Sequence, residues 1–179
     1  MEIFKIAVTG NVGAGKTTFI RTISETKVVD TERRVTDETA SLKQNTTVAF
    51  DFGRITLNPE QVLYMYGTPG QSRFDFMWDI VIDQVEAYVL LVAAHRPQDF
   101  RGARKILTFI NSKVKMPMII GFTHTDCEGA WHQEDILLSL GFSDKNSRPP
   151  VVEVNAENPS SVAQSLIVLL EELMLVPVS

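Results

Sequence analysis

The segment VTGNVGAGKTTF, residues 8–19, constrains the fold of this chain more than any other stretch. It contains GNVGAGKT (10–17), which satisfies the pattern G-x-x-x-x-G-K-[S/T]. The apolar run at 3–8 before it is typical of a buried strand, and the residues after Lys16 have the spacing of an amphipathic helix. A strand, a glycine-rich turn and a helix in this order predict a phosphate-binding loop within a layered α/β fold.

The residue types in this loop suit the binding of a phosphate chain. Glycines let the backbone turn its N–H groups inward without a side chain in the way, and the helix adds its positive N-terminal end. Lys16 would neutralise the outer phosphates and stabilise developing charge, and the Thr17 hydroxyl would coordinate Mg²⁺. We therefore predict a nucleoside triphosphate held by Gly10, Asn11, Val12, Gly13, Ala14, Gly15, Lys16, Thr17 and Thr18.

Composition limits the class of protein. The 179 residues, 44% of them hydrophobic, fit one domain spanning 1–179. A formal charge of -5 without clustered Lys and Arg argues against nucleic acid as a partner. No apolar run is long enough to span a membrane, and position 2 and the C-terminus lack the residues of common lipid anchors. The single cysteine, Cys127, excludes an internal disulfide, so we expect a cytoplasmic protein.

The remaining pattern predicts alternating strands and helices. Only three residues separate the β-rich runs at 47–57 and 61–67, and a parallel connection needs about a dozen, so we expect an antiparallel hairpin. Further strands are predicted at 87–93, 117–122 and 150–154, and helices at 76–83, 98–113, 131–140 and 159–174. Together with 3–8, this gives a three-layer α/β fold with a six-stranded, mostly parallel sheet.

Two of these features resemble Ras-like GTPases. They are the antiparallel second strand, reached through the long polar segment 26–46, and the loop GTPGQ (67–71), which is similar to the Ras-like D-T-A-G-Q loop. The stretches TTVAFDFGRI and MYGTPGQSRFDFMW look like bacterial small GTPases of the gliding-motility MglA type and their relatives beside roadblock-domain proteins. The resemblance implies a P-loop NTPase of the Ras-like G-domain class. Its activity would be slow hydrolysis of GTP to GDP, which makes it a molecular switch.

The resemblance also implies roles for individual residues. The Gly70 N–H would bind the γ-phosphate, and Gln71 would orient the attacking water. Thr47 would complete the Mg²⁺ shell, with Thr46 as its rival. A roadblock/longin-type regulator and an effector would contact Thr31–Thr47 and Gly70–Asp79, where Phe74, Phe76 and Trp78 offer an aromatic partner surface.

The chain departs from the Ras-like pattern at two phosphate-side positions. Gly67 stands where those proteins have an aspartate that holds Mg²⁺ through water. Asp51 follows Thr47 by four residues, about 13 Å of extended strand, so we expect it to be an ordinary strand residue and not a substitute. Val12 occupies a position where Ras needs glycine, so crowding of Gln71 predicts a low intrinsic rate.

The predicted base-binding loop is THTD (123–126), which replaces the Ras-like N-K-x-D. Asp126 can accept hydrogen bonds from N1–H and N2–H₂ of guanine, whereas the N1 acceptor of adenine would repel it. Thr123 is expected to tie this loop to the phosphate loop and His124 to cover the base, unless both are plain loop residues. Asn155 and Ala156, in VNAEN (154–158), match the family's final base contact.

Two rival functions remain open from the sequence. Val12 and Gly67 are also compatible with a GTP-binding switch that does not hydrolyse, and the phosphate loop alone is compatible with an ATP-using protein. His95 and His132 lie in no metal-ligand pattern, so both are predicted to be surface residues.

Overall fold

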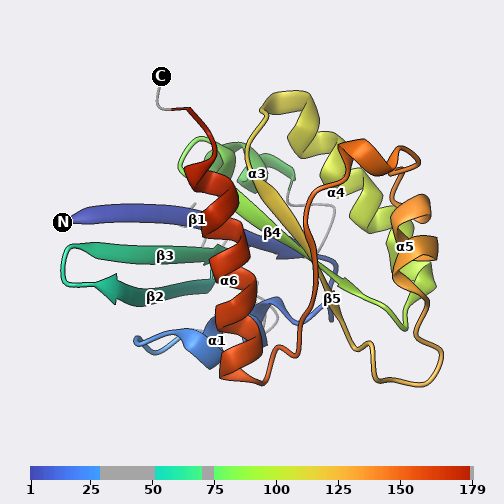
Figure 1. Ribbon diagram of the computed structural model, residues 1–179, viewed down its shortest axis with the longest axis horizontal. Helices are drawn as coiled ribbons and strands as arrows, with labels where there is room; N and C mark the ends of the chain where they lie inside the picture. Colours follow the sequence, from blue (N-terminus) through green and yellow to red (C-terminus); the bar gives the residue numbers. More distant parts are fainter. Residues whose placement is uncertain (29–50, 70–74, 178–179) are drawn as a thin grey trace, which may run out of the picture.

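The computed structural model describes residues 1–28, 51–69 and 75–177, with the side chains of 75–77 left out. The described strands form one six-stranded sheet in the order β2-β3-β1-β4-β5-β6 (Figure 1). Their bounds are β1 Glu2–Gly10, β2 Asp51–Asn58, β3 Gln61–Gly67, β4 Ala87–Ala93, β5 Met118–Thr123 and β6 Val151–Glu153. Each predicted strand is confirmed, apart from residues 47–50, which lie outside the described ranges.

The hairpin of β2 and β3 is antiparallel, and every other neighbouring pair in the sheet is parallel. The prediction of one antiparallel strand in a mostly parallel sheet is therefore confirmed. β4 is buried at all seven positions, as its unbroken apolar sequence requires of a central strand covered on both faces. β2, at the sheet edge, becomes exposed toward Asn58.

Helices follow the strands as predicted. Their bounds are α1 Lys16–Ile23, α3 Asp75–Ile82, α4 Phe100–Lys113, α5 Gln133–Ser139 and α6 Pro159–Met174, with 3-10 turns η3 Pro97–Asp99 and η4 Lys145–Ser147. The start of α6 shows how local sequence sets a boundary: Asn158 accepts a hydrogen bond from the Ser161 N–H, and Pro159 occupies the first turn.

Helices cover both faces of the sheet, giving the predicted three layers (Figure 1). On one face, Phe19 and Ile20 of α1 and Val162 of α6 pack with Ile6 and Val8 of β1. On the other face, residues of α3, α4 and α5 pack against β4 and β5. Among the described helices, none is both long enough and apolar enough to cross a membrane.

Four parallel strands end on the same side of the sheet, and each is followed by a loop. β1, β4, β5 and β6 end at Gly10, Ala93, Thr123 and Glu153. Because carboxyl ends of parallel strands share an edge, the loops after them lie next to one another. The phosphate loop and the predicted base-binding loops are therefore brought to the same end of the molecule.

Candidate functional site

The phosphate loop has the backbone that its sequence predicts. Gly10, Gly13 and Gly15 have φ values of 148°, 82° and 104°, in the region that favours glycine. A side chain at Gly10 would also collide with the carbonyl of Leu91 in β4, so this glycine lets β1 pack closely there. The loop then leads into α1, and the first N–H groups of a helix have no partner within the helix itself.

Lys16 lies inside this loop. Its side chain is buried, and its ammonium group donates hydrogen bonds of 2.8 Å to the carbonyls of both Gly10 and Asn11. These contacts hold the charge at the loop's centre, next to the N-terminus of α1. A buried cation beside a helix N-terminus is suited to an anion such as a phosphate chain.

Asp51 reaches the phosphate loop, contrary to the sequence-based expectation. It is buried at the first position of β2, and its Oδ2 accepts a hydrogen bond of 2.6 Å from the hydroxyl of Thr17. Asp51 is a paired strand residue, as expected, but the distance counted along the strand from Thr47 did not reveal its contact with Thr17. The side chain instead leans across the sheet end toward α1, so Asp51 joins the site.

Gly67 makes room for this contact. Asp51 and Gly67 are direct partners in the antiparallel ladder, so their side-chain positions share one face of the sheet. A Cβ built on Gly67 would lie 2.9 Å from the Asp51 Cβ and 2.8 Å from the Ile20 Cδ1. The chain therefore has a carboxylate on β2 directly opposite Gly67, the β3 position where the Ras-like pattern has an aspartate.

The predicted base-binding loop is tied to the phosphate loop. Thr123, at the end of β5, is buried and donates a hydrogen bond of 2.8 Å from its hydroxyl to the Ala14 carbonyl. This is the link expected for Thr123 from the sequence. His124 follows with φ 56°, a conformation uncommon outside glycine and asparagine, and its Nδ1 lies 3.1 Å from the Thr123 hydroxyl oxygen.

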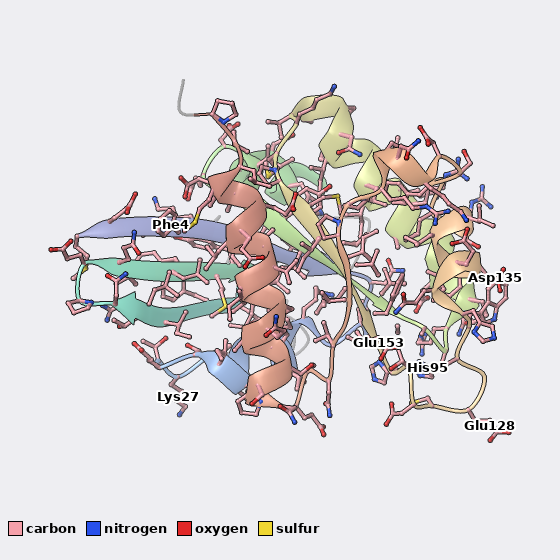
Figure 2. All side chains as sticks on the ribbon, in the orientation of Figure 1. Phe4, Lys27, His95, Glu128, Asp135 and Glu153 are labelled. Carbon is pink, nitrogen blue, oxygen red and sulfur yellow. The ribbon has the colours of Figure 1, made fainter. Side chains whose placement is uncertain are left out.

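His95 belongs to this end of the molecule and is not simply a surface residue as predicted (Figure 2). Its ring centroid lies 4.6 Å from that of His124, with a tilt of 30° between the rings. Burial, with a smaller contribution from the neighbouring His95, lowers the pKa of His124 below its usual value. His124 is therefore neutral near pH 7. The rings of His95 and His124 lie next to one another beside the loop.

The other predicted base-side residues have distinct environments. Asp126 is exposed at the end of its loop. The Ala156 carbonyl accepts a hydrogen bond from the Thr22 hydroxyl, and a Cβ on Gly15 would lie 3.5 Å from the Ala156 Cβ. Asn155 caps its own turn by accepting from the Glu157 N–H. The structure thus places Ala156 beside the phosphate loop, and its contact with the base stays a prediction.

Several predicted site residues lie outside the described ranges. These are Gly70, Gln71, Phe74, Thr46, Thr47 and the rest of the segment Thr31–Thr47. The side chain of Phe76 is not described either. Trp78 is buried, with 6% of its surface exposed, and packs in the core beneath α3, so it does not contribute to an exposed aromatic surface.

The start of α4 also contacts the phosphate loop, which sequence reasoning missed. The Asn11 amide donates a hydrogen bond to the Asp99 carbonyl, and a Cβ on Gly102 would lie 2.7 Å from the Asn11 Oδ1. Val12, the next loop residue, is 48% exposed. Gly102 inside an otherwise regular helix was the available sequence signal, since such a glycine often marks a close approach.

The sequence profile of a family described as conserved hypothetical ATP-binding proteins matches residues 26–179 of the chain. The chain belongs to this family. The matched range begins after the phosphate loop, so loop and profile support nucleotide binding separately. This member is also 27% identical, over 122 residues, to an uncharacterized protein of Methanocaldococcus jannaschii; the alignment covers 68% of the chain and 70% of that protein.

A solved structure extends the comparison to the whole fold of this family member. The Arl6 (BBS3) small GTPase of Trypanosoma brucei, with the bound nucleotide analogue GppNp, is similar with a TM-score of 0.69. The likeness covers 96% of this chain and 98% of that one at 15% identity, a level at which it shows the fold alone. The fold is therefore that of Ras-like small GTPases, and its phosphate loop identifies a nucleotide-binding P-loop protein.

Proposed function

We propose that the protein is a guanine-nucleotide switch that binds GTP with Mg²⁺ and hydrolyses it slowly to GDP. The observation that carries the proposal is the arrangement at the start of α1, where the Lys16 ammonium is held by the Gly10 and Asn11 carbonyls and the Thr17 hydroxyl donates to Asp51. A buried cation, a hydroxyl and a carboxylate there provide what a Mg²⁺–triphosphate group requires. The Ras-like fold supports the switch assignment, and Val12 supports a low rate.

The residues present fit a magnesium ion. The Thr17 hydroxyl is the proposed direct ligand, and Asp51 is placed to orient that hydroxyl or a water bound to the metal. The described residues contain no group of three or more His, Cys, Asp or Glu at metal-binding distance. Mg²⁺ would accordingly take its other oxygens from phosphate, water and Thr47, since it is rarely bound by protein ligands alone. The ion would neutralise phosphate charge.

Asp126 is the proposed reader of guanine. It lies at the end of the loop that Thr123 ties to the phosphate loop, and it is exposed to an incoming base. The name of the family favours ATP instead, so adenine is the rival. Isothermal titration with GDP and ADP separates them. We expect GDP to bind at least about tenfold more tightly, and Asp126→Asn to remove that preference; equal or tighter ADP binding would refute the guanine assignment.

Gln71 is proposed to orient the attacking water, while Lys16 and the loop amides stabilise developing charge. A binding-only switch is the second candidate, because Val12 is exposed on the loop and the Ras-like resemblance implies that a side chain at this position hinders hydrolysis. Single-turnover conversion of GTP to GDP, followed by chromatography, distinguishes the two. The hydrolytic proposal expects wild type to exceed the buffer rate and Gln71→Ala to approach it. Identical rates in both proteins and in buffer would leave only binding.

A regulatory partner of the roadblock/longin type is proposed for the segments Thr31–Thr47 and Gly70–Asp79. The support is the resemblance of the chain to MglA-type GTPases, together with the low rate expected from Val12. A purified roadblock-domain protein should bind the GTP-loaded form in preference to the GDP-loaded form and accelerate turnover. Equal binding to both forms, without any acceleration, would argue against this partner class.

A further inference from the structure

A concave surface lies between α4 and α5, beginning at the start of α4, next to the residues that contact the phosphate loop. These helices lie side by side on one face of the sheet (Figure 1). The groove between them has a volume of about 870 Å³, and its lining is mainly apolar. Its rim is cationic, formed by Arg101, Arg104 and Lys105 of α4. We call it the α4–α5 groove.

The groove has an aromatic floor. Phe100 is buried, and Trp131 packs edge-on against it with ring centroids 5.4 Å apart. Trp131 nevertheless keeps 45% of its surface exposed. The half-buried Phe109 lines the groove further along α4. A large exposed aromatic beside a buried one is typical of a binding surface, because it offers area at little entropic cost.

The rim cations have no acidic partners within the described ranges. Arg101, Arg104 and Lys105 are exposed, and no ion pair joins any of them to a described carboxylate. Arg104 packs its guanidinium against Gly141, just beyond the end of α5. By contrast, Arg96 and Arg148 each pair with a carboxylate at 2.6 Å and 2.7 Å.

The spacing directs these cations to one side of α4. Positions 101, 104, 105 and 108 recur every three or four residues, so they share one helical face. This face belongs to a chain whose formal charge is -5. A local concentration of unpaired positive charge on an acidic chain is an electrostatic feature that selects an acidic occupant.

We propose that the α4–α5 groove binds a partner protein through an acidic segment with one aromatic or aliphatic anchor. The anchor would pack on Trp131 and Phe100, and flanking carboxylates would pair with Arg101, Arg104 and Lys105. A peptide fits better than a nucleic acid, because three cations over an apolar hollow do not form the longer basic track that a phosphate backbone needs. None of the residues that line the groove belongs to the phosphate loop, so the proposal is tested without nucleotide.

The test is a polarisation titration with a fluorescein-labelled peptide of about twelve residues, one tryptophan flanked by glutamates. Saturable binding is expected, weakening as salt is raised. The double variant Arg101→Glu, Lys105→Glu should weaken binding by at least about tenfold, and Trp131→Ala by a similar factor. Lys115→Glu makes the same kind of charge change at an exposed position outside the groove, and it should bind like wild type.

Three comparison probes make the result decisive. They are a lysine-flanked version of the peptide, a single-stranded oligonucleotide, and vesicles containing an anionic phospholipid. The proposal is overturned if the lysine peptide binds equally well, if the oligonucleotide or the vesicles compete more strongly, or if no saturable binding occurs. It is also overturned if the groove variants, shown folded by circular dichroism, bind as wild type does.

Discussion

The phosphate loop is held from two sides, and the two anchors differ in kind. From the β5 side, the buried Thr123 hydroxyl donates to the Ala14 backbone carbonyl. From the β2 side, the Asp51 carboxylate accepts from the Thr17 hydroxyl. The first anchor joins a neutral group to backbone, and the second joins a charged group to the side chain proposed to bind Mg²⁺.

This difference assigns the two anchors separate tasks. The contact of Thr123 fixes the distance between the base-binding loop and the phosphate loop, and nothing in it responds to a metal. The contact of Asp51 involves a hydroxyl that a bound ion would recruit, so this anchor should rearrange when Mg²⁺ enters. The phosphate loop is therefore held by one contact that Mg²⁺ leaves unchanged, from Thr123, and by one that Mg²⁺ should alter, from Asp51.

The largest effect is expected from Asp51→Asn. The amide keeps the size of the side chain but removes its charge, so orientation of Thr17 toward Mg²⁺ should be weakened. Loss of a residue that orients a metal ligand costs about 10- to 100-fold in metal affinity or activity. Titration of nucleotide with and without Mg²⁺ measures this, because the loss should appear only with the metal.

Asp51→Ser removes the charge and also shortens the side chain, and it should show at least the same Mg²⁺-dependent loss. If Asp51→Asn lowers nucleotide affinity equally with and without the ion, Asp51 has only a structural role. The difference between the two anchors would then disappear.

Gly67→Ala tests whether Asp51 needs a glycine opposite it. The added Cβ would meet Asp51 and Ile20 at less than 3 Å, and such overpacking costs about 1–3 kcal/mol of stability. Urea unfolding measures the cost. Pairing it with Asp51→Gly should recover part of the loss, because one of the two close contacts is removed; a purely additive double variant would contradict the proposed packing.

The register of the β2–β3 hairpin places Asp51 opposite Gly67, a pairing that a distance counted along one strand does not contain. A hairpin that closes with Asn58 opposite Gln61 and continues without interruption would place Phe52 opposite Gly67. An irregularity between Thr56 and Asn58 shifts the pairing by one residue, so that Asp51 faces Gly67 instead. A one-residue shift moves every side chain to the other face of the strand.

The parts of the fold that follow from local pattern were predictable. The central strand β4 is continuously apolar, and the glycines of the phosphate loop stand at positions where φ is positive. The predicted contact of Thr123 required only that neighbouring parallel strands end at the same edge. By contrast, the irregularity in β2 and the stacking of His95 on His124 depend on packing between distant segments, which no single stretch of sequence displays.

A smaller effect is expected at the fixed anchor. Thr123→Val replaces the hydroxyl by a methyl group of similar shape and removes the bond to Ala14, which should cost about 1 kcal/mol of stability. Nucleotide affinity should fall by the same modest factor with and without Mg²⁺. Thr123→Ser retains the hydroxyl and should recover most of the lost stability. If Thr123→Val lowered nucleotide affinity only with Mg²⁺ present, the Thr123 contact would also be coupled to the metal.

The smallest effect concerns pH and the histidine beside the fixed anchor. Because the folded-state pKa of His124 lies below its unfolded value of about 6.5, the unfolded chain takes up a proton first as pH falls. The contribution of His124 to stability is therefore complete above about pH 6.5 and is lost on acidification below it. Asn tolerates the positive φ of this position, so His124→Asn should leave the loop undisturbed. The urea concentration at the unfolding midpoint should then fall less between pH 7.5 and pH 5 than it does in wild type. An unchanged slope in His124→Asn would assign the acid sensitivity to other groups and leave the loop anchored by Thr123 alone.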